Sequence, residues 1–331
     1  MEQKEIVGIT IGDAAGIGPE IVCKAMLENE PFACCRPLVI GDAKVLEFYR
    51  DKLNLPVRVE TVSDIEAHDY RRGVVSVLQV GNLNFCPEMV GQYSADCGKA
   101  MLEYAATGIR MCMENRLHAV LGGPHTKKSV DMANIEFHGY PDFVAQQTGA
   151  KQAFIMLVAG TLRVCNATLH VAMREACNLI SKDLVLTAIR EVDDAVQRLG
   201  VARPRIAVAG LNPHAGEEGM FGMEEIDEIA PAIQEAQRLG FDVKGPFAGD
   251  SLFFRCLEDN KYDAYIGMYH DQAHIALKTL AFENSSGLII GTPIIFSTVG
   301  HGSAFGIAGQ NKAFSSSLVA TIKLIANMKR R

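Results

Sequence analysis

Short apolar runs and longer amphipathic stretches alternate along the chain. The apolar runs have the length of buried strands and are bounded by Gly or Pro; they cover residues 6–11, 37–40, 74–80, 119–122, 155–158, 206–209 and 264–268. Amphipathic stretches with helical spacing lie between them, for example at 98–115, 182–199 and 224–239. This alternation predicts an α/β fold with mostly parallel sheets.

The chain has 331 residues, enough for one large core or for two lobes, and we expect two. The sequence contains no fixed-period repeat, no low-complexity linker and no long run of charge. Because no linker separates them, the two lobes are expected to be interwoven, with the chain crossing between them more than once.

Composition and charge narrow the functional classes. The net charge of −7 argues against nucleic acid or an anionic membrane as the main partner. The nine cysteines form no Cys-x-x-Cys pair, so zinc-finger and thioredoxin-like sites are excluded and reduced thiols are expected. The first residues lack the layout of a signal peptide, and no apolar stretch is long enough to span a bilayer. We therefore predict a soluble, cytoplasmic protein, with an anionic small molecule still open as its substrate.

A glycine-rich segment, GDAAGIGPE at residues 12–20, stands where a predicted strand meets a predicted helix. Glycines there allow a ligand to approach the backbone closely, and a helix N-terminus favours an anion. A structural turn explains the same glycines equally well, so both interpretations stay open. The spacing is not Gly-x-Gly-x-x-Gly, and no Rossmann fingerprint is inferred.

Three histidines stand at or just beyond predicted strands. His170 ends a β-like segment, His214 lies in a loop after 206–209, and His270 comes just after 264–268. Open α/β sheets assemble their sites at the C-terminal ends of strands, and neutral imidazoles are the commonest ligands of zinc-like ions. A single histidine in such a place is more often a hydrogen-bonded structural residue, but three in equivalent positions favour a metal site.

The pair His270 and His274 also has the i,i+4 spacing of a helical metal clamp. We favour the clamp less, because Asp271 and Gln272 between the two histidines are typical of a loop. No glutamate that could act as a general base accompanies the pair.

Five segments, in order along nearly the whole chain, resemble signature segments of the 4-hydroxythreonine-4-phosphate dehydrogenase family: GDAAGIGPE, LNPHAGEEGMFGMEE, GPFAGD, MYHDQ with Lys278, and VGHGSAFGIAGQNKA. The resemblance implies two interwoven α/β/α lobes with an isocitrate/isopropylmalate dehydrogenase-like fold. It also implies an NAD- and metal-dependent oxidoreductase that forms a homodimer. His170, His214 and His270 are then the metal ligands, one of them from the partner subunit. Zinc is the favoured metal, with magnesium, cobalt and manganese as alternatives.

The motifs divide the chain into two predicted lobes. Residues 1–133 with 300–331 carry the glycine-rich segment and the dinucleotide loop, and residues 134–299 carry the metal, substrate and dimerisation residues. The resemblance implies that the loop wraps the adenosine of the cofactor through His301, Gly302, Ser303, Ala304 and Gly309. Gly306 stands where related isopropylmalate dehydrogenases have an Asp, so the choice between NAD and NADP is left open.

The implied reaction oxidises a secondary alcohol of a hydroxy acid by hydride transfer to NAD. Loss of CO₂ follows where a carboxylate lies β to the new ketone, and a divalent cation lowers the pKa of the alcohol. Asp250 and Asp271 are candidates for orientation or proton transfer, with a solvated loop carboxylate as the alternative for each. Lys278 matches the substrate-binding lysine of the family.

Four positions depart from the family pattern around the substrate. Tyr140 and Pro141 stand where the family has His-Thr, Gly287 stands for an Asn, and Phe296 stands for an Arg. The loss of a bidentate Arg removes a phosphate anchor, and a phenyl ring in its place adds an apolar wall.

Other positions are similar to the terephthalate dihydrodiol dehydrogenase branch, including His125 in GGPHTKKS. Lys127 and Lys278 could hold a carboxylate. We therefore predict a non-phosphorylated substrate, a cyclic diol carboxylate. The alternatives are 4-hydroxythreonine 4-phosphate, as in pyridoxal phosphate biosynthesis, and 4-phosphothreonate or 4-phosphoerythronate.

A non-enzymatic relative that binds only a metal or a ligand is the alternative from another class. The presence of three histidines and of the dinucleotide loop argues against it, and against a purely structural protein. Metal analysis combined with an NAD-induced thermal shift discriminates these classes from an active dehydrogenase.

Overall fold

The computed structural model describes residues 4–254, 261–281 and 285–331. The chain forms two compact units: residues 1–151 with 292–330 make the first unit, and residues 152–291 with Arg331 make the second. The sequence placed these boundaries at 133/134 and 299/300. The chain leaves the first unit and later returns to it, as interwoven lobes require.

The first unit is built on a parallel sheet with the strand order β3-β4-β2-β1-β5-β12. The central strands are buried along almost their whole length, which explains their continuous apolar sequences. The strands are β1 (Ile6–Thr10), β2 (Arg36–Gly41), β3 (Arg58–Thr61), β4 (Val74–Gln79), β5 (Ala119–Gly122) and β12 (Phe296–Val299).

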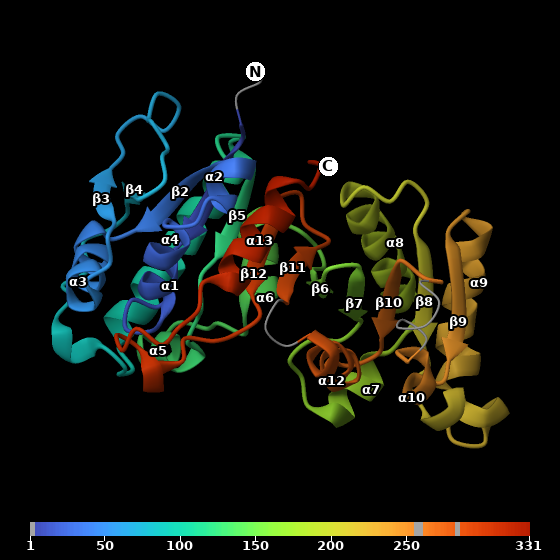
Figure 1. Ribbon diagram of the computed structural model, residues 1–331. Helices are drawn as coiled ribbons and strands as arrows, with labels where there is room; N and C mark the ends of the chain where they lie inside the picture. The colour runs from blue at the N-terminus through green and yellow to red at the C-terminus, as the bar shows by residue number, and fades with distance from the viewer. Residues whose placement is uncertain (1–3, 255–260, 282–284) are drawn as a thin grey trace. The chain divides into compact units, whose positions relative to one another are not determined.

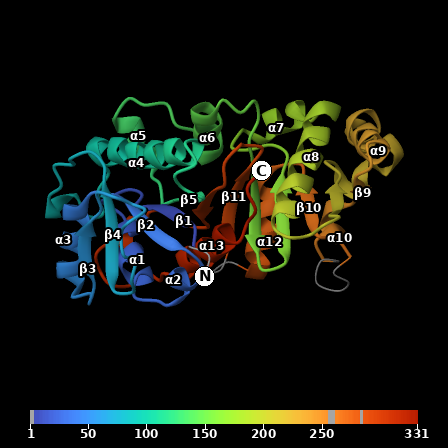
Figure 2. The same cartoon turned by 90° about the horizontal axis from the view of Figure 1, so that it is seen from above.

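Helices cover both faces of this first sheet (Figure 2). On one face α4 (Ala95–Met113) packs over β1, β2 and β5, and on the other α13 (Ser316–Ala326) packs against β5 and β12. The other elements of the unit are α1 (Gly18–Ala25), α2 (Glu30–Cys34), α3 (Ala43–Leu53), α5 (Lys127–Met132), α6 (Tyr140–Thr148) and the short 3-10 turns Pro87–Met89 and Phe305–Ile307.

The second unit has a mixed sheet with the order β11-β6-β7-β10-β8-β9. Strand β6 is antiparallel to both of its neighbours, β11 and β7, whereas β7, β10, β8 and β9 run parallel to one another. The strands are β6 (Phe154–Ala159), β7 (Leu162–Asn166), β8 (Arg205–Ala209), β9 (Asp242–Phe247), β10 (Ala264–Gly267) and β11 (Ser286–Ile290).

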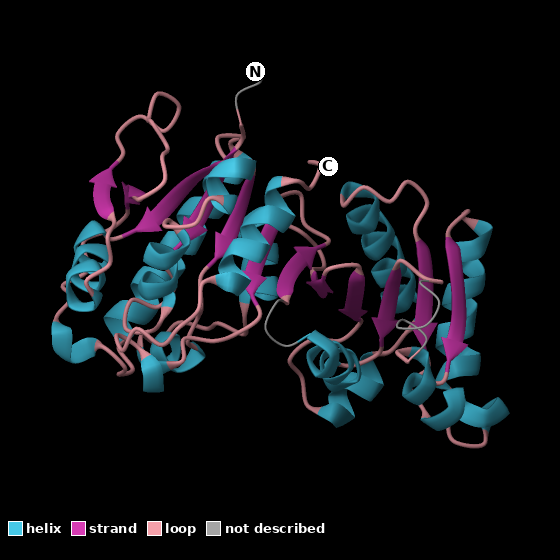
Figure 3. Cartoon of the chain, viewed as in Figure 1, coloured by secondary structure: helices cyan, strands magenta, loops and turns pink. Residues whose placement is uncertain are grey.

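Two helices of the second unit lie on opposite faces of its sheet (Figure 2): α8 (Lys182–Arg198) packs against β10, and α12 (His270–Ala281) packs against β7, β10 and β6. The remaining elements are α7 (Met173–Leu179), the 3-10 turn Pro213–Gly219, the π-helical turn Glu225–Ile229, α9 (Ala230–Arg238) and α10 (Gly249–Leu252). Figure 3 shows the helix and strand layers of this unit.

The three adjacent parallel strands β7, β10 and β8 end at the same edge of the second sheet, where α7, α12 and α10 lie (Figure 1). His170 follows β7, His270 follows β10 and His214 follows β8. The prediction that these histidines come after the C-terminal ends of strands is therefore confirmed.

The predicted α/β class with mostly parallel sheets is confirmed, and all seven predicted strands form within two residues of their expected ends. Two local predictions are wrong. Residues 271–272 belong to the first turn of α12 and not to a loop, and His170 does not end a strand, because β7 stops at Asn166.

No helix within the described ranges is long and apolar enough to cross a membrane. The eight cysteines in those ranges are free thiols, as the sequence predicts, and Cys256 lies outside the described residues.

Candidate active site

Helix α12 begins three residues after the end of β10 and carries most of the predicted chemistry of the second unit. Its start is fixed by Gln272, whose Oε1 accepts a hydrogen bond from the Met268 N–H at 2.6 Å. The same side chain donates from Nε2 to the Gly210 carbonyl at 2.9 Å. One amide thus satisfies the N–H of Met268, just before the helix, and ties α12 to the residue that follows β8.

His270 is oriented by its neighbour Asp271. The His270 Nδ1 lies 2.7 Å from Asp271 Oδ1. Because an ionised carboxylate only accepts hydrogen bonds, the ring donates from Nδ1, which leaves the lone pair of Nε2 for another partner. A carboxylate on the far nitrogen is the arrangement that commonly fixes the tautomer of a metal-binding histidine.

His170 lies beside His270, with 5.3 Å between the ring centroids. Both histidines line a cavity of about 270 Å³ together with Asp271 and Tyr269. The structure therefore brings two of the three predicted metal ligands together within one unit.

The third predicted ligand, His214, lies in a left-handed turn. Five consecutive residues from His214 to Glu218 have φ between +45° and +81°, and only Gly216 among them is a glycine. A left-handed conformation costs an ordinary residue roughly 1–2 kcal/mol, so this turn must be held by its surroundings.

Glu225 holds this turn. Its Oε1 accepts hydrogen bonds from the backbone N–H groups of Leu211 and Asn212, each at 2.7 Å. Its Oε2 accepts from Asn212 Nδ2 at 2.9 Å. Gly216 packs over this carboxylate, because a Cβ there would lie 2.7 Å from Glu225 Oε2.

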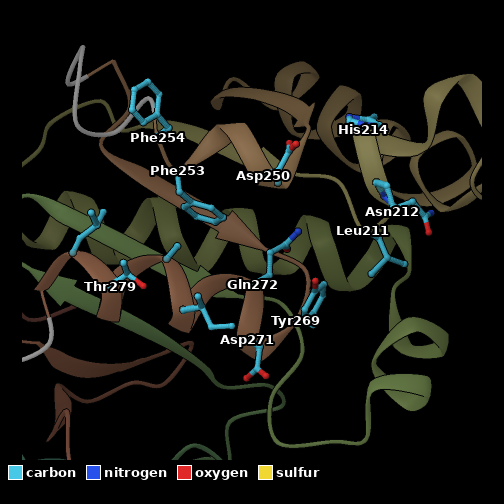
Figure 4. A pocket seen from close by; sticks show the side chains of 15 residues that line it. Leu211, Asn212, His214, Asp250, Phe253, Phe254, Tyr269, Asp271, Gln272 and Thr279 are labelled. Atoms are coloured by element: carbon cyan, nitrogen blue, oxygen red, sulfur yellow. The ribbon is translucent and has the colours of Figure 1, made fainter.

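A larger cavity, of about 700 Å³, collects further predicted residues of the second unit. Figure 4 shows His214, Asp250 and Asp271 on its wall, from three separate elements. Asp271 also lines the smaller cavity beside His170. The two predicted catalytic carboxylates therefore lie along one cavity, with Asp271 shared between the two spaces.

His274 and Lys278 follow His270 at successive turns of α12. The rings of His274 and His270 stack at 3.8 Å between centroids with 24° between their planes. Burial, and then the nearby positive groups of His270 and Lys278, lowers the pKa of His274 to about 3, so this ring is neutral. Lys278 lines a cavity of about 370 Å³ with both histidines.

A metal needs more ligands than this arrangement provides. Among the residues that the structure describes, no group of three His, Cys, Asp or Glu side chains could hold a metal ion. The pair His170 and His270 nevertheless has the donor chemistry of a zinc-type site, since Asp271 bonds Nδ1 of His270 and not Nε2. Within the described residues, one chain thus brings two of the three predicted ligands together.

In the first unit, the glycine-rich turn and the dinucleotide loop pack directly on each other. The Ile17 N–H donates to the Ser303 carbonyl at 3.0 Å, and a Cβ on Gly16 would lie 2.7 Å from Ser303. Gly12, at φ +70°, has Pro124 O in the place of its missing Cβ. These glycines serve close packing, in agreement with the structural-turn interpretation.

Ser303 is buried, and Thr126 Oγ1 donates to its Oγ at 2.6 Å. Ala304 has left-handed backbone angles, and Gly309 lies against Lys52 at φ +66°. Around His301, Gly302 and Gly306 the loop is open, since a Cβ on either glycine would meet no atom within 4 Å among the described residues. The roles of His301, Gly302, Ser303, Ala304 and Gly309 in cofactor binding stay predictions.

Two of the residues predicted to form the substrate wall are core residues of the first unit. Phe296 is fully buried in β12, and Tyr140 is 1 % exposed and donates its hydroxyl to the Gly123 carbonyl at 2.9 Å. Their rings pack at 5.1 Å, and His125 packs on Tyr140 at 4.8 Å. The prediction that Phe296 adds an apolar wall to the substrate site is wrong, because its ring is fully buried against Tyr140.

Three other positions that were predicted near the substrate lie in regular helices or strands. Pro141 is buried in the first turn of α6. Lys127 begins α5, and burial lowers its pKa, which Asp142 partly offsets. Gly287 is buried in β11 of the second unit. None of these observations tests a contact with substrate.

The sequence did not reveal Glu225 or Gln272 as site-supporting residues. Gln272 lies four residues after Met268, a spacing that could have indicated a side chain folded back on the residues just before a helix. Glu225 acts on backbone thirteen residues away, and no local signal marks such a contact.

A family model described as pyridoxal phosphate biosynthetic protein PdxA matches residues 33–325. A protein of Clostridium botulinum that carries the provisional name D-threonate 4-phosphate dehydrogenase is 38% identical over 326 residues, which cover 98% of this chain and 97% of that protein.

Two solved structures resemble the whole chain to different degrees. A 4-hydroxythreonine-4-phosphate dehydrogenase from Burkholderia phymatum is 34% identical with a TM-score of 0.85, and all of both chains is covered. A terephthalate 1,2-cis-dihydrodiol dehydrogenase from Burkholderia xenovorans is 32% identical with a TM-score of 0.68, covering 99% of each chain. The fold is therefore closer to the former.

Proposed function

Since the chain belongs to the PdxA family, we propose that it is a dehydrogenase that oxidises a secondary alcohol of a phosphorylated hydroxy acid with NAD and a divalent metal ion. D-threonate 4-phosphate is the favoured substrate, because the curated relatives with 38% identity over almost the whole chain are named for it. The observation that carries the proposal is the gathering of His170, His270, Asp271 and Lys278 at one edge of the second sheet.

The predicted cyclic diol carboxylate is not supported. The solved dihydrodiol dehydrogenase is the less similar fold, and the argument from Phe296 fails because its ring is packed on Tyr140. A fully buried phenyl group replaces an Arg without adding a wall to a binding site. The cation of Lys278 remains to pair with a phosphate or a carboxylate.

The metal is proposed to bind His170 and His270 of one chain and His214 of a second copy. Support comes from the incomplete ligand set of a single chain and from the apolar surface beside His214. In that segment Met220, Phe221, Met223 and Ile226 are each 46% exposed or more. Such a patch is typical of a protein interface, and burial in a homodimer would cover it. Zinc suits the imidazole ligands.

When bound, the divalent ion would make the alcohol more acidic and NAD would accept the hydride from its carbon. Asp271 holds the ring of His270 through Nδ1, so we assign it an orienting role. Asp250 is exposed on the wall of the 700 Å³ cavity and is assigned the role of proton acceptor for the alcohol. Lys278 attracts the anionic end of the substrate.

The product of this oxidation determines whether CO₂ is lost. Oxidation of D-threonate 4-phosphate at the carbon next to the phosphorylated one gives a ketone with the carboxylate in the β position. The bond to the carboxylate then breaks, its electron pair forms an enolate, and a proton completes the product. We therefore propose one CO₂ for each NADH formed.

The test measures NADH formation by the metal-loaded protein with three substrates: D-threonate 4-phosphate, 4-hydroxythreonine 4-phosphate and the terephthalate cis-dihydrodiol. The proposal expects the largest kcat/KM with the first, which differs from the second by a hydroxyl in place of an amino group. His138→Ala is the matched control for the ligand variant His270→Ala, because His138 is exposed and bonds only Glu136 among the described residues. A preference for the dihydrodiol, or equal activity of His270→Ala and His138→Ala, would contradict the proposal.

A further inference from the structure

His274 is a buried histidine whose polar atoms the fold leaves unused. Its side chain is 8% exposed, and neither Nδ1 nor Nε2 has a hydrogen-bond partner within the described part of the chain. Buried polar groups in folded proteins are nearly always hydrogen-bonded, because leaving one unpaired destabilises the fold. A phenyl ring would fill the same space without this cost, so the nitrogens of His274 require another explanation.

The surroundings of this ring are those of a binding site. His270 covers one face of the ring, and Lys278 lies one helical turn further along α12. All three residues line the cavity of about 370 Å³, together with Asp271, Ile275 and Thr279. His270 and Lys278 are both partly exposed, so a ligand that engages them enters beside His274.

Joint metal binding by His270 and His274 does not fit this geometry. The lone pair of an imidazole nitrogen lies in the plane of its ring. Two rings that stack at 3.8 Å with only 24° between their planes direct their lone pairs side by side and not toward one point. A zinc ion requires each nitrogen about 2.0–2.1 Å away, along its lone pair. The partner of His274 is therefore a different group from the partner of His270.

We propose that His274 is a substrate-recognition residue, whose ring N–H donates a hydrogen bond to the same substrate oxyanion that Lys278 attracts. The oxyanion is the phosphate or the carboxylate of the hydroxy acid, and the inference rests in this respect on the proposed function. A hydrogen bond to a charged group in a site shielded from water is stronger than one between neutral groups. That gain offsets the unpaired nitrogens of the ligand-free protein.

His274→Phe tests the inference, because it keeps a flat buried ring and removes both nitrogens. His118→Phe is the matched control: His118 is also buried, but its Nε2 bonds the Met328 carbonyl at 3.0 Å and its Nδ1 accepts from Arg330. We expect His274→Phe to melt no lower than the wild type without ligand and to bind the substrate about tenfold or more weakly, with KM changed more than kcat. His118→Phe should melt lower and keep the wild-type KM. A His274→Phe protein with unchanged KM would overturn the inference.

The shared oxyanion is tested with Lys278→Met and the double variant. Two residues on one group are coupled, so the combined loss of affinity should be smaller than the product of the single losses. A loss of affinity in the double variant equal to the product of the two single losses would contradict a shared oxyanion. Inorganic phosphate and D-threonate, titrated separately by calorimetry, tell which group is bound. These probes also separate the two proposals. If the wild type oxidises no phosphorylated hydroxy acid, the proposed function fails. The role of His274 is judged separately by anion binding: weaker binding by His274→Phe supports it, and unchanged binding refutes it.

Discussion

In the first unit, several buried polar side chains beside the glycine-rich turn, such as Asp13, Thr126 and Ser303, are hydrogen-bonded to the protein, whereas the predicted site of the second unit contains a buried ring without hydrogen-bond partners among the described residues and a strained left-handed turn. Asp13 accepts from the Ala15 N–H and the Ser129 hydroxyl, and Thr126 donates to Ser303. Around α12, by contrast, His274 has two unpaired nitrogens among the described residues, and His214 stands in a left-handed turn.

The difference distinguishes a scaffold from a site. Satisfied buried networks make a fold rigid and define its shape, but they offer little to a ligand. Unsatisfied groups and strained residues destabilise a fold and are found where a ligand or metal compensates for them. By this criterion we expect the metal and the substrate in the second unit, while the turn at residues 12–18 packs against the dinucleotide loop of the first.

The largest effect is expected from Asp271→Ala. Without the carboxylate on Nδ1, the tautomer and orientation of His270 are no longer fixed, and the affinity for zinc should fall about 10–100-fold. Competition with a chelator measures this affinity. Asp131→Ala is the matched control, because Asp131 only pairs with Lys128 at the surface among the described residues. Equal zinc affinity of the two variants would remove Asp271 from the site.

A smaller effect is expected from Glu225→Gln. The amide that replaces one carboxylate oxygen cannot accept every hydrogen bond from Leu211 and Asn212, so the left-handed turn loses support. We expect a loss of about 2 kcal/mol in the free energy of unfolding, measured with urea, together with weaker zinc binding. Glu136→Gln, at an exposed position, should change stability by no more than about 0.5 kcal/mol. Unchanged zinc binding in a destabilised Glu225→Gln protein would show that the turn is structural only.

The smallest effect concerns the closed network of the first unit and its pH dependence. Burial raises the pKa of Asp13 above its ordinary value of 3.8, despite the hydrogen bonds from Thr126, Ala15 and Ser129 that lower it. The folded state therefore holds this proton more tightly than the unfolded chain. The resulting stability is fully present below the unfolded pKa and is lost as the pH rises through the folded pKa.

In Asp13→Asn this contribution is absent, so the decline of stability above about pH 4 should be shallower by up to about 1.4 kcal/mol per pH unit. Urea unfolding of the wild type and the variant across this range measures the difference. Parallel pH profiles would show that Asp13 titrates as it does in the unfolded chain.

Much of the fold followed from the sequence because buried parallel strands are continuous apolar runs, such as Ala119–Gly122. The start of α12 was missed for a physical reason. Polar residues such as Asp271 and Gln272 are typical of loops, but Gln272 here bonds the backbone N–H of Met268 just before the helix, and Asp271 bonds the ring of His270. The second hydrogen bond of Gln272 is to the carbonyl of Gly210, sixty-two residues earlier, and a contact of this kind cannot be seen in the local sequence.

The positions of the three histidines in the fold were predictable, but the burial of Phe296 was not. A histidine after a strand is placed by chain order alone, so His170, His214 and His270 were located correctly after β7, β8 and β10. Whether Phe296 faces a ligand or the core depends on Tyr140, which is far away in sequence and packs on its ring. Tertiary burial of this kind leaves no mark in a single sequence.

The central claim is that the end of β10 and the start of α12 form a metal site, and metal content tests it most directly. Three proteins are compared: the wild type, His270→Ala and the control His138→Ala. Each is dialysed first against a zinc solution and then against zinc-free buffer, and the number of zinc ions bound per chain is measured. The account predicts one zinc ion per chain in the wild type and in His138→Ala, and none retained in His270→Ala. Stoichiometric zinc in His270→Ala would contradict it.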